Sequence, residues 1–398
     1  MRRLMSDRSL RVGLVYDDTI DRHGGIGVYV TTLGAALRRQ GHHVEYLLGS
    51  SALASFEGVP VRSLARNVNV RFNGNVLSMP AWSRGSRLDQ ALRRGRFDVL
   101  HVQVPYSPLM AGRLLTRAGG RCAVIGTYHV ASDQLLPRVG AAALRVLKAP
   151  SASRFDAMIS VSETAAAFAA RWSGMDAGQV VPNLLDVSRV RRDVAAAAVR
   201  PNHDVAFVGR LVPRKGCGEL LEALGHLKRS ADWRPLRVAI VGDGPLRRRL
   251  ERRARALGLA DSVAFHGAVD DQRKFALLSG ARVACFPSLF GESFGVVVLE
   301  ALAAGTEAVL AGDNPGYREL LKDPRALVDP RDPVAFGARL RRFLEEDRLR
   351  EEVGQRQRRL VVRCDADAVS GRIVDIYRTA LRGRRTAPLT KEPLRVVA

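Results

Sequence analysis

Residues 10–48 read LRVGLVYDDTIDRHGGIGVYVTTLGAALRRQGHHVEYLL, and this stretch contains the pattern that decides the fold. Leu10 to Tyr16 is an apolar run of strand length, whereas Val28 to Arg39 repeats its apolar residues with helical spacing. Gly41 then stops the helix, and His43 to Leu48 is a second strand-like run. A strand, a helix and a strand in this order predict two parallel strands joined by a crossover helix.

The same alternation continues along the chain. Further strands are expected at Phe97–Val102, Cys122–Thr127, Ala157–Val161, Val205–Val208, Leu236–Val241, Val263–His266 and Val283–Pro287. Helical stretches lie between them, and Ser162 is the expected N-cap of one. We therefore predict an α/β protein of two Rossmann-like domains, each a doubly wound parallel sheet. Ligands of such sheets bind outside the carboxyl ends of the strands, so the two domains should face a shared central cleft.

A break in the alternation sets the domain boundaries. We expect a first domain over residues 1–186, a linker over 187–203, a second domain over 204–365, a returning C-terminal helix over 366–382 and a poorly ordered tail over 383–398. Asp365-Ala366-Asp367 has the spacing of a metal-binding DxD motif, but it lies where the last helix should begin. We interpret it as a helix start, because acidic residues are favoured there.

The composition limits the partners. The net charge is +23, and only six of the 63 basic residues are lysine. Such a balance favours phosphorylated substrates or an anionic membrane surface, although an arginine-rich genome would also produce it. The arginines are spread along the chain and aromatic residues make up only 6%, which argues against nucleic-acid binding.

Cysteine spacing and hydropathy indicate the compartment. Four distant cysteines without a CxxC pair indicate free thiols in a reducing compartment rather than a zinc site. No apolar run reaches membrane-spanning length, and the N-terminus lacks the apolar segment of a signal peptide. We expect a cytoplasmic protein whose membrane contact, if any, is peripheral, on the inner face of the cell membrane.

Residues 290–300 read FGESFGVVVLE and carry the strongest functional signal. A strand ends at Pro287 and a helix begins near Gly295, so free backbone N–H groups at the helix start form a ready site for a diphosphate. Glu292 and Glu300 are eight residues apart, which lets one carboxylate reach a sugar and the other a ribose. The alternative is that Glu300 is an early-helix acid favoured by the helix dipole.

Three other segments add weaker signals. Arg210 and Lys215 flank a turn between a strand and a helix and suit a diphosphate leaving group, although an exposed basic loop would look the same. Gly24 and Gly25 lie in a glycine loop before the first helix, where backbone can approach a phosphate. His129 follows the end of a strand, so its side chain could face the cleft and contact a ligand, or it could have a purely structural role.

Together these segments resemble glycosyltransferase family 4, the retaining GT-B enzymes with an E-x7-E motif, over Leu10 to about Arg382. Within the family the resemblance is closest to the phosphatidylinositol mannosyltransferases. The residues that carry it are Gly24-Gly25, Phe72-Asn73-Gly74, Phe97-Asp98-Val99-Leu100-His101, Thr127-Tyr128-His129, Arg210 with Lys215, and Gly291-Glu292-Ser293-Phe294-Gly295.

The resemblance implies transfer of a hexose with retention, with mannose from GDP-mannose as the best candidate and without a metal or other cofactor. Arg210 and Lys215 would stabilise charge on the leaving phosphate, while Glu292 and His129 would contact the sugar. Donor binding is implied for Gly24, Gly25, Ser293, Phe294, Gly295, Val296, Val297 and Glu300, with Glu300 on the ribose. A leaving-phosphate oxygen is thought to deprotonate the acceptor in this family, which explains why no carboxylate nucleophile is needed.

The sequence departs from the family pattern in two places near the motifs. Glu307 replaces the proline that usually follows Gly-Thr, and Leu184 replaces the glycine of Pro-Asn-Gly. The acceptor positions differ more. Asp18, Gly27 and Gln134 stand where the phosphatidylinositol enzymes carry Tyr, Gln and Lys, while Asn73 is retained. We therefore expect a glycolipid or polyol-type acceptor, with phosphatidylinositol itself a poor one.

Three alternatives stay open. The chain could use a UDP-sugar on a small-molecule or polysaccharide acceptor, or it could be a non-catalytic GT-B-like binding protein. A Rossmann oxidoreductase would require G-x-G-x-x-G after a strand, which Gly25-Ile26-Gly27 does not complete. A peripheral membrane contact is suggested by Leu88 and Leu92, which fall on one helix face and are flanked by Arg84, Arg87, Arg93, Arg94 and Arg96. A solvated helix face above two core leucines would show the same pattern.

Overall fold

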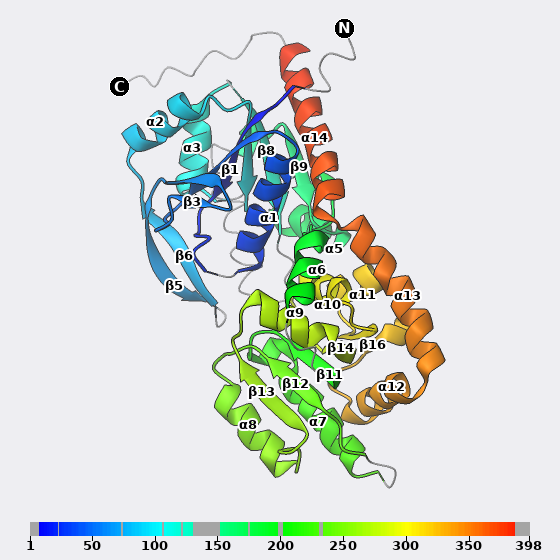
Figure 1. Ribbon diagram of the computed structural model, residues 1–398. Coiled ribbons are helices and arrows are strands. Elements are labelled where there is room, and N and C mark those ends of the chain that lie inside the picture. Colours follow the sequence, from blue (N-terminus) through cyan, green and yellow to red (C-terminus); the bar gives the residue numbers. More distant parts are fainter. Residues whose placement is uncertain are drawn as a thin grey trace.

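The computed structural model describes residues 8–22, 24–72, 75–105, 107–120, 122–129, 152–173, 176–197, 202–230 and 234–386. Two sheets with helices on both faces form two domains, one above the other in Figure 1. The first sheet has eight strands in the order β10-β9-β8-β7-β1-β2-β4-β3, and the second has six in the order β13-β12-β11-β14-β15-β16. The predicted α/β class with two doubly wound sheets is confirmed.

The first domain contains the strands β1 (Arg11–Tyr16), β2 (His43–Leu48), β3 (Ser55–Phe56), β4 (Val59–Ser63), β7 (Val99–Gln103), β8 (Ala123–Tyr128), β9 (Ala157–Ser160) and β10 (Gln179–Val180). Its helices include α1 (Gly25–Arg39), α2 (Gly85–Gly95), α3 (Met110–Ala118) and α5 (Glu163–Phe168). Every strand pair of this sheet is parallel except β3 with β4.

The central strand β1 is buried on both faces, as its unbroken apolar sequence predicts. Leu14 packs in the core on the side of α1, whereas Val15 packs in the core on the side of α2 and α3. Helix α1 lies close to β2, where a Cβ on Gly34 would come within 2.3 Å of the Tyr46 hydroxyl. Gly41, with φ +83°, ends the helix as expected.

The second domain repeats this plan with the strands β11 (His203–Val208), β12 (Val238–Val241), β13 (Val263–Gly267), β14 (Ala281–Phe286), β15 (Ala308–Gly312) and β16 (Leu327–Val328), all paired in parallel. Its helices are α7 (Cys217–Lys228), α8 (Arg247–Ala256), α9 (Asp271–Ser279), α10 (Val296–Ala304), α11 (Pro315–Leu321), α12 (Pro333–Glu345) and α13 (Asp347–Arg363).

Two helices connect the domains. Residues 187–196, expected as linker, form α6 (Val187–Ala196), whose N-cap Asp186 accepts from the Arg189 amide at 2.8 Å. Helix α6 packs on α9 and α10, so this segment is part of the second domain's surface. Helix α14 (Ala366–Thr386) crosses back to the first domain, where it packs on α1 and β8 (Figure 1). It continues four residues past the expected end at residue 382.

The strands β3, β4, β5 (Arg66–Phe72), β6 (Asn75–Trp82), β10, β15 and β16 were not expected from the sequence, and the structure decides how the two leucines of α2 lie. The strands β5 and β6 form an antiparallel hairpin that precedes α2. In α2 itself Leu88 is fully buried, and Leu92 is partly buried against the same core. The face with Leu88 and Leu92 is therefore seated on the domain, and the proposal that it contacts a membrane is wrong for these two leucines.

Candidate active site where the two domains meet

The loop between β14 and α10 contains the FGESFG sequence and depends on two glycines. Gly291 has φ +74° and Gly295 has φ +100°, a conformation that residues with a Cβ rarely adopt. A Cβ on Gly295 would also lie 2.4 Å from Cε1 of Tyr317. No side chain caps α10, whose N-cap is Gly295, so amide groups of its first turn are available to a ligand.

The residues after Glu292 divide between the core and the helix start. Phe294 is buried in the core, so its contribution to a donor site can come only from its backbone. Val296 and Val297 are the first two residues of α10, and both are partly buried. Their amides lie in the uncapped first turn, which suits the predicted contact with a diphosphate.

Glu292 is the anionic centre of the site. Its side chain is 10% exposed, and Oε1 accepts from Nζ of Lys215 at 2.6 Å and from Nη1 of Arg214 at 2.9 Å. Burial would raise the pKa of Glu292, but the charges of Lys215 and Arg214 outweigh it and hold the pKa below its ordinary value. The carboxylate is therefore ionised at neutral pH.

The basic loop after β11 lies directly against the glycine loop. Gly216, with φ +72°, permits this approach, because a Cβ there would meet the Pro287 carbonyl oxygen at 1.8 Å. Arg210 is partly buried, and burial together with the charge of Arg214 lowers its pKa. Arg214 and Lys215 thus pair with one carboxylate while Arg210 lies close enough to Arg214 to feel its charge, and this excess of positive charge suits a diphosphate. A role in diphosphate binding was predicted for Arg210 and Lys215, but not for Arg214.

Glu300 pairs with a cation from another element. Its Oε1 accepts from Nζ of Lys274 on α9 at 2.9 Å, and Lys274 also pairs with Asp271 at 2.9 Å. Burial would lower the pKa of Lys274, but Glu300 and Asp271 outweigh it and raise the pKa. Lys274 was not predicted from the sequence. Lysine is rare in this chain, and two of its six lysines, Lys215 and Lys274, bind the carboxylates of the E-x7-E motif, so the rarity itself was a usable signal.

Ser293 joins the two domains. Its Oγ donates to the His129 carbonyl oxygen at 2.7 Å, and its own carbonyl accepts from Oγ of Ser162. Nearby, the Glu319 carboxylate of α11 accepts from the amides of Glu163 and Thr164, at 2.7 and 2.9 Å. The donor loop of the second domain is therefore held at the carboxyl ends of β8 and β9.

His129 is a buried residue whose ring faces its own domain. Nε2 bonds to Oε1 of Gln103 at 2.7 Å, and the ring lies edge-on to Tyr29 with centroids 4.6 Å apart. Burial lowers the pKa of His129 to about 3, so the ring is neutral at physiological pH. At the domain boundary His129 contributes its carbonyl oxygen, which accepts from Ser293. The contact of its ring with a sugar stays a prediction. Gln103 and Tyr29 were not predicted.

The first glycine loop meets the start of α1. Gly24 is the N-cap, no side chain caps the helix, and a Cβ on Gly24 or Gly25 would meet nothing within 4 Å. Open space and uncapped amides suit the predicted approach to a diphosphate. Gly27 is instead buried against the backbone of Thr19 and Arg22.

The other predicted acceptor residues are only partly described. Asp18 is partly buried, its Oδ1 accepts from the Thr19 amide at 2.8 Å, and burial raises its pKa. Asn73 and Gln134 lie outside the described residues. Among the described residues no group of three or more His, Cys, Asp or Glu side chains is arranged to hold a metal ion. Within that same part of the chain no helix has the length and apolar character to cross a membrane.

One departure from the family pattern has a structural explanation. Glu307, which stands in place of a proline, accepts from Nε of Arg350 on α13 at 2.5 Å. The Arg350 side chain is only 7% exposed, so Glu307 neutralises a buried guanidinium away from the candidate site. Leu184, in place of a glycine, is buried in the core.

Comparison with known proteins agrees with this geometry. Residues 23–189 match the model of Glycosyltransferase Family 4, and residues 196–360 match that of Glycosyl transferases group 1. The chain is 33% identical over 377 residues to a phosphatidyl-myo-inositol mannosyltransferase of Mycolicibacterium smegmatis, covering 93% of this chain and 94% of the relative. A GDP-mannose-dependent alpha-(1-6)-phosphatidylinositol monomannoside mannosyltransferase of the same organism is 28% identical, covering 94% and 97%.

Among solved structures, the UDP complex of HepE from Anabaena superposes with a TM-score of 0.73 at 17% identity, covering 93% of this chain and all of that one. This likeness confirms the GT-B fold that the sequence resemblance implied. The family is shown by the 33% identity to the relative from Mycolicibacterium smegmatis over nearly the whole chain, together with the two family models. The chain is a glycosyltransferase and belongs to glycosyltransferase family 4.

Proposed function

We propose that the chain transfers mannose from GDP-mannose to a glycolipid or polyol-type acceptor, with retention and without a metal. The observation that carries the proposal is the pairing of Lys215 and Arg214 with the buried Glu292, at the uncapped start of α10. The choice of acceptor class is supported by relatives named as mannosyltransferases of phosphatidyl-myo-inositol and of phosphatidylinositol monomannoside, and the choice of donor by the GDP-mannose dependence in the second name.

The cations explain how the leaving group would depart. Negative charge grows on the diphosphate as the bond to the sugar breaks, and preorganised donors aimed at that charge lower the barrier. Lys215, Arg214 and Arg210 supply three cations, while the helix starts at Gly25 and Val296 supply backbone N–H groups. These groups perform the role that a divalent metal would otherwise have.

The proposed reaction balances without a protein nucleophile. The acceptor hydroxyl oxygen bonds to the anomeric carbon on the face from which the diphosphate leaves, and the carbon–oxygen bond to the diphosphate breaks. The hydroxyl proton passes to an oxygen of the leaving phosphate. Glu292 stays ionised throughout, because Lys215 and Arg214 lower its pKa, so it can accept a hydrogen bond from a sugar hydroxyl.

Two alternatives are weaker. A UDP-sugar donor is suggested by the UDP complex of the structural neighbour, but at 17% identity that likeness supports only the fold. A non-catalytic binding protein would not need two cations on one nearly buried carboxylate. We further propose that the enzyme works in the cytoplasm, against the inner face of the membrane, because the relatives' acceptors are lipids.

A donor panel tests the proposal. Thermal unfolding is followed with GDP-mannose, GDP, UDP-glucose and UDP, since a ligand that binds only the native state raises Tm by mass action. We expect the GDP compounds to raise Tm most, and transfer of labelled mannose to extracted lipids to continue in EDTA. Stabilisation by UDP compounds alone would overturn the donor, and an absolute need for added Mg²⁺ or Mn²⁺ would overturn the metal-free mechanism.

A further inference from the structure

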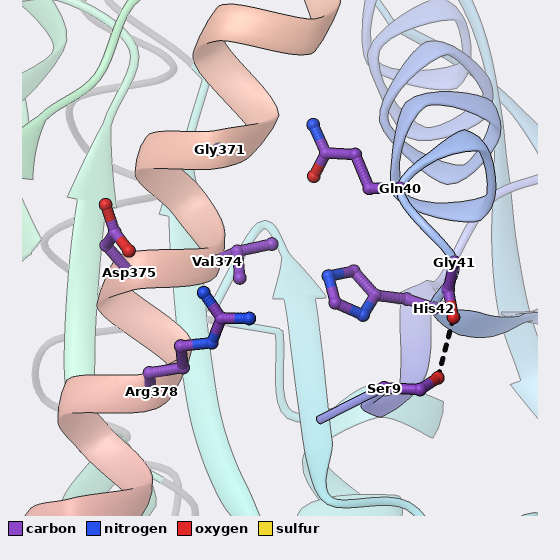
Figure 2. A pocket seen from close by; sticks show the side chains of 8 residues that line it. All are labelled: Ser9, Gln40, Gly41, His42, Gly371, Val374, Asp375 and Arg378. Atoms are coloured by element: carbon purple, nitrogen blue, oxygen red, sulfur yellow. Dashed lines mark hydrogen bonds between the residues drawn. The ribbon is translucent and has the colours of Figure 1, made fainter. Parts of the chain in front are cut away.

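A pocket of about 440 Å³ lies between the C-terminal end of α1 and the middle of α14 (Figure 2). Its walls include Ser9, Gln40, His42, Gly371 and Arg378. Helix α1 has 15 residues, so the pocket is separated from the Gly24–Gly25 loop by the whole helix, about 22 Å. It is therefore distinct from the candidate active site, and its residues have no part in the proposed reaction.

Arg378 lacks an acceptor inside the pocket wall. Its Nε is buried and has no hydrogen-bond partner in the part of the chain that the structure describes. The neighbouring carboxylate of Asp375 points away from His42 and from the Arg378 guanidinium (Figure 2). No residue in the described part of the chain forms a hydrogen bond or an ion pair with the Arg378 guanidinium, so this cation of the pocket wall can pair with an oxyanion from outside the chain.

His42 supplies a second donor. It is 8% exposed, and its Nδ1 accepts from the Leu10 amide at 3.2 Å, which places the proton on Nε2. Burial and the charge of Arg378 lower the pKa of His42, so it donates as a neutral imidazole. In Figure 2 its ring faces the same hollow as the Arg378 guanidinium.

The wall around these donors is already held in place. Nε2 of Gln40 donates to the Asp367 carbonyl at 3.0 Å and to Oγ of Ser370 at 2.8 Å, which fixes the end of α1 on α14. Oγ of Ser9 donates to the Gly41 carbonyl at 2.7 Å and keeps a lone pair to accept from a ligand. A preformed polar wall needs little rearrangement when a ligand binds.

We propose that this pocket binds the phosphate or carboxylate group of a small polar molecule, with Arg378 as the ionic partner and Nε2–H of His42 as the second donor. The volume is in the range of small-molecule sites, which is larger than an inorganic anion needs. The rest of the ligand would occupy the space beside Gly371, where a Cβ would meet nothing within 4 Å. This inference does not depend on the proposed function.

Calorimetric titration of the full chain tests the site, with inorganic phosphate, citrate and glucose 6-phosphate as probes. Arg378→Gln should weaken binding by about tenfold or more, the usual loss for a charged hydrogen bond. Gly371→Leu keeps every charge and fills the open space, so it should abolish binding of the larger probes. Leucine is also the better helix former, which keeps this variant folded.

Two controls separate the pocket from general electrostatics and from the donor site. Arg363→Gln removes one exposed charge from α13 and should leave binding unchanged. Titration with saturating GDP present keeps the probes off the donor cations, so the binding that remains belongs to the pocket. Tighter binding of glucose 6-phosphate or citrate than of phosphate supports a small-molecule ligand, and equal binding supports the anion subsite alone. Absence of saturable binding, or equal losses in Arg378→Gln and Arg363→Gln, would overturn the proposal.

Discussion

Lys215 has two electrostatic partners in the proposed cycle, because it holds the buried Glu292 carboxylate at rest and would stabilise the leaving phosphate during turnover. We expect Lys215→Ala and Arg210→Ala each to lower turnover at saturating donor by about 10²–10³-fold. Arg214 still pairs with Glu292 in both variants, so the fold should persist. Arg249→Ala, on an exposed face of α8, is the matched control. Near-parental turnover in both variants would remove these residues from the site.

Individual motif residues could be predicted, whereas their partners could not. Glu292, Glu300, Arg210 and Lys215 stand at fixed spacings around a strand, a turn and a helix, which are local features. Lys274 reaches Glu300 from α9, and Gln103 reaches His129 from β7. These pairings depend on how strands and helices far apart in the chain pack together, which spacing does not encode.

Two buried histidines should make the protein acid-sensitive. Burial lowers the pKa of His101 and His129 to about 3, whereas in the unfolded chain both titrate near the ordinary value of 6.5. As pH falls from 6.5 towards 3, the unfolded state gains these protons and the native state does not. The free energy of unfolding therefore decreases as the pH is lowered, by about 2 kcal/mol per histidine at pH 5.

Thermal unfolding at pH 7 and pH 5 measures this effect. The loss of Tm between the two pH values should be smaller in His101→Gln and in His129→Gln than in the parent. His226→Gln, in the last turn of α7, is a control without a buried ring. An unchanged loss of Tm in both variants would show that these rings do not carry the acid sensitivity.

At the scale of elements, most of the regular strand–helix alternation was predictable, whereas the β5–β6 hairpin was not. Buried parallel strands need apolar residues on both faces, so β1, β2, β8 and β11 are visible as unbroken apolar runs. The β5–β6 hairpin has a polar side that faces the domain. Nδ2 of Asn67 there donates to the Asp17 carbonyl at 2.8 Å. Asn73-Gly74 is a dipeptide typical of hairpin turns, but Asn73 was interpreted only as an acceptor-binding residue.

Helix α5 and Glu319 form a contact that should favour domain closure. The Glu319 carboxylate caps the start of α5, with Thr164 Oγ1 as a third donor at 2.8 Å. Charged hydrogen bonds of this kind contribute about 1.5–3 kcal/mol. We expect Glu319→Ala to lower kcat/KM about 10–100-fold, with little change in Tm because the substitution removes no buried apolar side chain.

Small-angle scattering in the presence of GDP checks the cause of that loss. The Glu319→Ala chain should have a larger radius of gyration than the parent, since fewer molecules are closed. Glu345→Ala, whose carboxylate pairs only within α12 among the described residues, should behave as the parent. Equal radii with a reduced kcat/KM would mean that Glu319 acts on something other than closure.

The surface around α2 remains a candidate for membrane contact, with Trp82 of the neighbouring hairpin in place of Leu88 and Leu92 as the apolar residue. Arg84, Arg87, Arg93, Arg94 and Arg96 are exposed, while the nearby hairpin exposes Trp82 by 66%. Each arginine near an anionic surface adds about 1 kcal/mol, and tryptophan favours the membrane interface. We expect binding to anionic vesicles to fall with salt, with Arg87→Glu/Arg94→Glu and with Trp82→Ala, but not with Arg363→Glu. Binding that is absent or insensitive to salt would exclude this contact.

On the scale of the whole molecule, two domains are fastened by α14 while the active site is divided between them. Tyr377 on α14 bonds to Nδ1 of His101 at 2.6 Å, and Nε2 of His101 bonds to Oγ1 of Thr127 at 2.6 Å. The C-terminal helix is thus tied to strands β7 and β8, directly behind His129. The proposed donor contacts come mainly from the second domain, so we expect the first domain to select the acceptor.

The choice of acceptor is where this chain should differ from its relatives. They are phosphatidyl-myo-inositol mannosyltransferases by name, whereas the sequence resemblance implies that Asp18 and Gln134 here replace a tyrosine and a lysine. An anionic headgroup needs a matched cation, and a site rejects mismatches strongly when buried polar groups lose their partners. Burial raises the pKa of Asp18, as expected for a carboxylate at a partly buried position.

We therefore expect little mannosylated product when the enzyme is incubated with labelled GDP-mannose and phosphatidylinositol vesicles. Replacing Asp18 by Tyr and Gln134 by Lys should raise that rate about tenfold or more, because the change removes one negative charge and adds a positive one beside the lipid phosphate. The donor site is untouched in this double variant, so hydrolysis of GDP-mannose by water serves as the internal control. Efficient product from the parent chain would show that these positions do not determine the acceptor, and phosphatidylinositol would then become the substrate of choice.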